Sequence, residues 1–95
     1  MVIGVCKINL LMEETFSLKE KRRILKSLID RLKSRFNASI AEVDLNDKWQ
    51  TSVLGIACVS NEGNHIDSML SSIIEFVEND GRVIITDYNT EKIYV

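Results

Sequence analysis

Residues 17–36, SLKEKRRILKSLIDRLKSRF, have the apolar spacing of one long α-helix. With about 100° of rotation per residue, six apolar side chains fall within one arc of about 120°, the width of a stripe that packs on a core. Ser17 and Glu20 have the spacing of a capping box, in which each side chain binds a free backbone N–H of the first turn. Asn37 is suited to end the helix in the left-handed conformation. The apolar stripe consists of Leu18, Leu25, Leu28, Ile29, Leu32 and Phe36.

The apolar stripe of this helix needs a partner layer, and four β-like segments of the chain can supply it. Each is either alternating or continuously apolar, which is typical of strands. The first has one fully apolar face and one mixed face, as expected of a strand in a sheet that is covered on one side. A turn rich in Asn and Asp at residues 46–49 joins the two middle segments. The predicted strands are residues 2–12, 38–45, 50–60 and 82–95, the last with a bend around Asn89.

A second amphipathic helix is predicted from the i, i+3, i+4, i+7 spacing of apolar residues between Ile66 and Val77, ending near Gly81. The resulting order, βαββαβ, is the ferredoxin-like split βαβ motif. We therefore expect a single α+β domain over residues 1–95. Its four-stranded antiparallel sheet should have the first and third strands at the centre and both helices on one face.

Location and redox state are predicted from what the sequence lacks. No segment has the ~18 consecutive apolar residues of a membrane helix, and Lys7 interrupts an N-terminal stretch that has no basic region before it. We expect a cytoplasmic protein that does not bind membranes. Cys6 and Cys58 lack the spacing of a metal or redox motif and are expected to be buried, reduced thiols.

The positive charge is concentrated on the first predicted helix. Residues 17–36 contain eight of the twelve Lys and Arg residues and two acids, a net charge of +6, whereas the rest of the chain carries four bases and twelve acids, or −8. On a helical wheel one flank is basic and is interrupted only by Asp30, while Arg31 and Arg35 lie on the opposite shoulder. The bland interpretation is a solvated polar face, but such a face would normally mix charges. The basic flank consists of Lys19, Arg22, Arg23, Lys26 and Lys33.

The preferred hypothesis is therefore a non-enzymatic module that binds structured RNA, such as ribosomal RNA. Phosphate contacts from the basic flank would give salt-sensitive, mostly sequence-independent affinity. The alternative is a homo-oligomeric interaction module. In it, Ile3, Val5 and Leu11 form part of a sheet face that the helices leave open.

Lys21 is an exception among the basic residues, because it falls inside the apolar arc of the helix. Either its stem extends along the core and its ammonium reaches solvent, or it pairs with Glu42 or Asp44 and anchors the start of the helix. Glu42 and Asp44 alternate along one strand and would share a face, but no third ligand for a metal is apparent. Ion pairing is the preferred interpretation.

The only tryptophan and the only histidine give weak signals. Trp49 is predicted either to close one end of the core or to stack on a base or a partner. His65 lacks the motif of an activated serine, so an enzymatic hypothesis would need it to converge with Glu42 and Asp44. We predict no catalytic residues, metal, cofactor or small-molecule substrate.

Five motifs distributed over the chain resemble the YlxP-like family of small bacterial proteins, which is classed as a domain of unknown function. They are SLKEKR at 17–22, EVD at 42–44, WQ at 49–50, VS at 59–60 and ITDYNTEKIYV at 85–95. The resemblance covers essentially the whole chain and implies a ferredoxin-like fold and a cytoplasmic protein. Members are often encoded beside translation initiation factor two and a ribosome-binding factor, which favours an association with RNA or the ribosome. No catalytic residues are established for the family, so the resemblance implies none.

Overall fold

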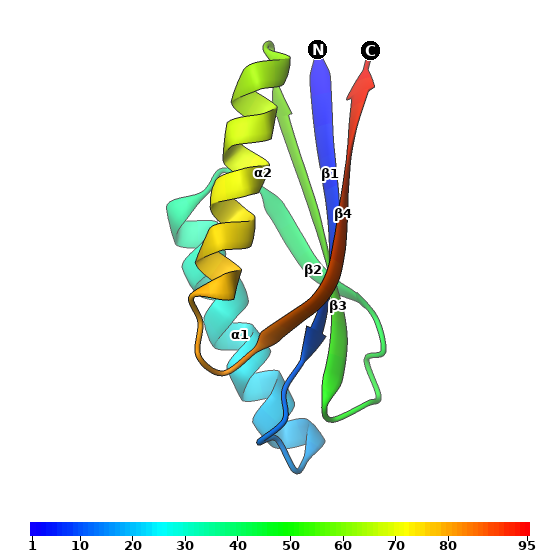
Figure 1. Ribbon diagram of the computed structural model, residues 1–95, viewed down its shortest axis with the longest axis vertical. Helices are drawn as coiled ribbons and strands as arrows, with labels where there is room; N and C mark the ends of the chain where they lie inside the picture. Colours follow the sequence, from blue (N-terminus) through cyan, green and yellow to red (C-terminus); the bar gives the residue numbers. More distant parts are fainter.

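The computed structural model describes all residues 1–95 as one sheet covered on one face by two helices (Figure 1). The strands are in the order β2-β3-β1-β4, and every neighbouring pair is antiparallel. This arrangement confirms the predicted ferredoxin-like fold, with the first and third strands at the centre. The elements are β1 (Val2–Leu11), α1 (Leu18–Arg35), β2 (Ser39–Asp44), β3 (Thr51–Ser60), α2 (Gly63–Glu78) and β4 (Ile84–Tyr94).

The core forms between the helices and the inner face of the sheet. On β1 the alternate residues Cys6, Ile8 and Leu10 are buried, and each faces a β3 residue whose side chain is on the same side of the sheet. From α1 the stripe contributes the buried Leu25, Leu28 and Leu32, as the helical period predicted. Each such side chain contributes roughly 1.5–3 kcal/mol by leaving water. Neither helix is long and apolar enough to span a lipid bilayer.

The start of α1 is capped, with one difference from the predicted pattern. The Ser17 hydroxyl accepts a hydrogen bond from the Glu20 N–H at 3.1 Å. The Glu20 carboxylate accepts one from the N–H of Phe16, one residue earlier than in a standard capping box, at 3.0 Å.

The prediction of a left-handed Asn37 at the end of α1 is wrong. Phe36 is already extended, with φ of −124°, while its N–H still donates to the Leu32 carbonyl oxygen. The chain bends through Asn37 and enters β2 at Ser39, and the Phe36 ring packs against the core. Leu45 is the one non-glycine residue with a positive φ, at 58°.

The bend of β4 was predicted at the wrong residue. Asn9 pairs with Asp87 but Leu10 pairs with Ile85, so Thr86 is the extra residue of a β-bulge. The Thr86 hydroxyl donates to the Asn9 carbonyl oxygen at 3.3 Å. A bulge increases the local twist, and in Figure 1 β4 curves from beside the lower end of α2 before it runs along β1.

The outer face of the sheet is not covered by either helix. Residues that face each other in antiparallel strands share a face, so Val59 and Ile93 lie beside Ile3, one on each neighbouring strand. Val59 and Ile93 are 58% and 41% exposed. Ile3, Val59 and Ile93 thus form an apolar row on the open face.

Candidate nucleic-acid interface

The five side chains of the predicted basic flank are all exposed on α1. The flank is on the side of the helix away from α2, because Arg31 and Arg35, on the opposite shoulder, contact Phe76 of α2. With a rise of about 1.5 Å per residue, the flank extends about 21 Å from Lys19 to Lys33. It is thus a positive strip on one side of the domain, interrupted by Asp30.

The N-terminal half of the flank surrounds a surface hollow formed by α1 and its cap. Lys19, Arg22, Arg23 and Lys26 line this hollow together with Ser17 and the acid Glu20. Within the flank the structure has one ion pair, between Lys26 and Asp30 at 2.8 Å. The hydrogen bond to Asp30 raises the pKa of the Lys26 ammonium. The other four basic side chains of the flank make no ion pair with an acid, so their charge is available to an anion.

Lys21 is fully buried, with an exposed fraction of 0%. Its ammonium lies 2.8 Å from Oε2 of Glu42 and donates to the backbone carbonyl oxygens of Leu45, at 2.6 Å, and Lys48. The Ser52 hydroxyl donates to the same Glu42 oxygen at 2.6 Å. The ammonium therefore does not reach solvent, and the first turn of α1 is joined to the β2–β3 connection.

Asp44 is not part of this network, although the sequence predicted it on the same face as Glu42. The strand register shifts between the two residues, so that Glu42 pairs with Leu54 but Asp44 pairs with Val53. Leu54 and Val53 point to opposite faces of β3. The Asp44 carboxylate accepts a hydrogen bond from the Leu45 N–H at 2.8 Å, which supports the left-handed turn at Leu45.

Trp49 does not close the core. It belongs to the connection between β2 and β3 and is 49% exposed. The connection is held through its backbone by Lys21, so its fold does not require the indole ring to be buried. The core-cap interpretation is wrong, and stacking on a partner stays a prediction.

Glu42 and His65 do not converge. Glu42 pairs with Leu54, whereas His65 is near the start of α2, which follows Ser60 at the far end of β3. Ser60 lies six positions beyond Leu54 on β3, about 20 Å at ~3.3 Å per residue. Within the structure no group of three or more His, Cys, Asp and Glu side chains could hold a metal ion. Glu42 and His65 therefore do not share a site.

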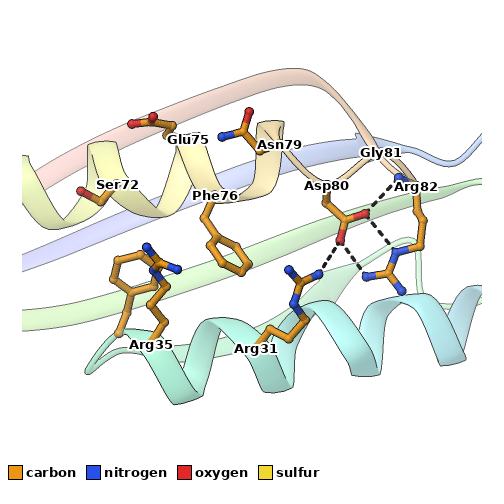
Figure 2. A pocket seen from close by; sticks show the side chains of 10 residues that line it. Arg31, Arg35, Ser72, Glu75, Phe76, Asn79, Asp80, Gly81 and Arg82 are labelled. Atoms are coloured by element: carbon orange, nitrogen blue, oxygen red, sulfur yellow. Dashed lines mark hydrogen bonds and ion pairs between the residues drawn. The ribbon is translucent and has the colours of Figure 1, made fainter.

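Three arginines outside the predicted set gather in a groove between the two helices (Figure 2). Arg31 and Arg35 come from α1, and Arg82 precedes β4. The guanidinium carbons of Arg31 and Arg35 lie 5.1 and 5.5 Å from the centre of the Phe76 ring. The helical wheel separated Arg31 and Arg35 from the basic flank but gave no sign of what would pack against them.

Asp80 is the buried acid of this groove. It accepts hydrogen bonds from the Arg82 side chain at 2.7 and 3.0 Å and from the Arg82 backbone N–H at 2.9 Å. The hydrogen bonds from the Arg82 side chain lower the pKa of the Asp80 carboxyl, against the opposing effect of burial. The same pairing raises the pKa of Arg82. Asp80 thereby fixes Arg82 at the end of the groove.

Two de novo designed proteins have similar structures. The designed ferredoxin-fold protein LFR1 1, solved by solution NMR, superimposes with a TM-score of 0.59 at 17% identity, covering 98% of this chain and 84% of its own. The designed protein Foldit4 has a TM-score of 0.55 at 11% identity, covering 100% of this chain and 99% of its own. Because a fold supports many functions, these likenesses describe the architecture alone.

The family relationship comes from the sequence. Over 78 residues the chain is 33% identical to the "Uncharacterized protein YlxP" of Bacillus subtilis (strain 168), covering 82% of this chain and 85% of that protein. A family described as "Protein of unknown function (DUF503)" matches residues 3–90. Neither description includes an enzymatic activity. The chain therefore belongs to the DUF503 family, as its resemblance to YlxP-like proteins predicted.

Proposed function

We propose that this protein is a non-enzymatic module that binds structured RNA, such as that of the ribosome, through the basic flank of α1. The observation that carries the proposal is the concentration of a net charge of +6 on this helix within a chain of net charge −2. The flank is exposed over its whole length and contains one internal ion pair. Like charges along one helix face are unfavourable by themselves, and an anionic partner would remove that cost.

The recognition mode would depend on the RNA backbone rather than on base stacking across the sheet. The central strands β1 and β3 contain no aromatic residue, whereas RNA-binding sheets of this topology use such side chains to stack bases. Phosphate contacts from Lys and Arg carry little sequence information. We therefore expect a preference for structured RNA over any particular sequence.

A salt titration of binding to purified ribosomal subunits tests this function. If the five flank side chains contact phosphates, the slope of log K against log salt concentration should be about −4. The triple reversal Arg22→Glu, Arg23→Glu and Lys26→Glu should abolish binding. Affinity that does not change with salt, or that survives the triple reversal, would contradict the proposal.

A matched control comes from the open sheet face. Lys7 is an exposed base on β1 and lies outside α1. Lys7→Glu changes the net charge as much as Arg22→Glu does. If the two single reversals weaken binding equally, net charge rather than the flank determines affinity.

A second candidate function is self-association through the open sheet face. The exposed Val59 and Ile93 beside Ile3, together with Val43 at 53% exposure, support it. Light scattering at high concentration measures the mass directly. We expect a dimer that Val59→Lys returns to a monomer, and a strictly monomeric protein at high concentration would exclude this function. Such a dimer would carry two basic helices and is compatible with RNA binding.

A further inference from the structure

The groove between α1 and α2 has a volume of about 560 Å³ and contains three guanidinium groups and two carboxylates. Asp80 is engaged by Arg82, as described above. The remaining carboxylate, Glu75, makes no ion pair in the structure and points away from the guanidinium groups in Figure 2. The groove thus retains positive charge that its own acids do not neutralise.

Arg31 and Arg35 carry this remaining charge. The contact between Arg31 Nη1 and Asp80 Oδ2 is 3.5 Å long, which is at the limit of a hydrogen bond, and Asp80 is already occupied by Arg82. Arg35 has no acidic partner within ion-pair distance. Two arginines at i, i+4 repel each other, yet both are held against one ring.

Phe76 explains how they are held. In Figure 2 the ring lies between the guanidinium groups of Arg31 and Arg35. In a cation–π contact the flat guanidinium group lies against the ring. The N–H groups along the edge of the guanidinium stay free to donate. The ring of Phe36 packs edge-on against Phe76, with the ring centres 6.1 Å apart, and fixes it. The two arginines are therefore oriented by the core although no acid pairs with either of them at short distance.

We propose that this groove binds phosphate groups, with Arg31 and Arg35 as their donors on either side of the Phe76 ring. A carboxylate can be satisfied by one bidentate arginine, whereas a phosphate offers further oxygens to additional donors. On α2, Ser72 lines the groove and its hydroxyl can donate such a further hydrogen bond. As a contact to RNA the site rests on the proposed function; as a site for inorganic phosphate it does not.

The test is an NMR titration of the full chain with sodium phosphate at constant ionic strength, maintained with sodium chloride. We expect saturable amide shifts centred on the groove. Arg35→Gln and Arg31→Gln should each weaken phosphate binding about tenfold, since each removes a charge-assisted hydrogen bond. Arg35→Lys keeps the charge but loses the fork and should recover binding in part. Lys26→Gln, on the flank of the same helix, is the matched control and should bind phosphate normally.

A second titration uses an oligoribonucleotide without terminal phosphates, in competition with inorganic phosphate. Displacement by the oligoribonucleotide identifies an RNA phosphodiester as a ligand of the site, and binding of inorganic phosphate alone identifies a phosphomonoester. Either result confirms the site. Shifts that do not saturate, or that are unchanged in folded Arg35→Gln and Arg31→Gln proteins, overturn it.

The two proposals fail in different ways. If the triple reversal on the flank abolishes RNA binding while phosphate never saturates the groove, the function stands and the groove site is wrong. If phosphate binds through Arg35 while RNA binding ignores salt and the flank, the groove site stands and the proposed function is wrong.

Discussion

The ammonium of Lys21 and the carboxylate of Glu42 lie 2.8 Å apart, with side chains that are 1% and 17% exposed. The remaining N–H groups of the ammonium donate to the carbonyl oxygens of Leu45 and Lys48. A buried charge is tolerated when it is both paired and hydrogen-bonded. The pair therefore joins α1 to the β2–β3 connection, and removing one partner would leave the other without compensation.

Lys21→Met tests this connection, because methionine keeps an unbranched apolar stem and removes the ammonium. We expect the free energy of unfolding to fall by about 3 kcal/mol or more, as when one partner of a buried ion pair is lost. Urea denaturation followed by circular dichroism measures it. Lys26→Met, which breaks the exposed pair with Asp30, should leave the urea midpoint nearly unchanged. Equal midpoints for the two variants would mean that the buried pair adds nothing to stability.

Gly4 of β1 allows α2 to approach the sheet closely. A Cβ at this position would lie 2.5 Å from Cγ2 of Ile66 and 3.2 Å from the sulfur of Cys58. Gly4→Ala should therefore lower the free energy of unfolding by about 1–3 kcal/mol through overpacking. Gly81→Ala is the control, since a Cβ on Gly81 has no neighbour within 4 Å. A thermal melt in which both variants behave alike would show that the approach of α2 is not constrained at Gly4.

The buried pair of Asp80 and Arg82 predicts a pH dependence. Hydrogen bonds from Arg82 hold the pKa of Asp80 below its ordinary value of 3.8, so between the folded and unfolded pKa values the unfolded state binds more protons. The stabilisation is present above the unfolded pKa and is lost as pH falls through the folded pKa. Asp80→Asn should cost about 1.5–3 kcal/mol near pH 7, and this difference from the unsubstituted protein should shrink in acid. Urea midpoints measured from pH 7 to about 2 would test it, and a difference that stays constant with pH would refute it.

The two thiols should react slowly in the folded protein. Burial, and secondly the neighbouring Cys58, raise the pKa of Cys6 to about 11, and burial raises that of Cys58. At pH 8 about one Cys6 thiol in a thousand is ionised, and the thiolate is the nucleophile. A disulfide reagent should therefore label both cysteines quickly in urea and only slowly without it. Fast labelling of native protein at the rate seen in urea would show that the thiols are accessible.

The arrangement of the six elements could be predicted because burial of one face imposes its own period on a helix or strand. The stripe of residues 17–36 and the alternation in the strands are consequences of the core itself. Element ends were less predictable, since they depend on single residues. The helix end at the extended Phe36 and the bulge at Thr86 come from packing with distant segments. The local sequence favoured Asn37 and Asn89 instead, because it carries no information about that packing.

The candidate site was predictable only on the flank of α1, where solvent exposure follows from the helical period and charge follows from composition. The helical period placed Lys21 within the apolar arc. In a strand of regular alternation, Glu42 and Asp44 share one face, so the sequence could not distinguish which of them pairs with Lys21. The bulge between these two residues turned Asp44 to the other face and left Glu42 as the partner. Periodicity cannot detect one inserted residue whose effect depends on pairing with β3.

The sequence by itself determined the fold class, the apolar stripe of α1 and the concentration of positive charge on that helix, because these depend on residues close together in the chain. The tertiary structure alone decided that Lys21 is buried beside Glu42, that Trp49 is exposed, and that Arg31 and Arg35 meet Phe76. The contacts of Lys21, Arg31 and Arg35 join residues that are far apart in sequence. They exist only because β2, the β2–β3 connection and α2 pack against α1. Local patterns carry no information about which shoulder of a helix a distant segment will cover.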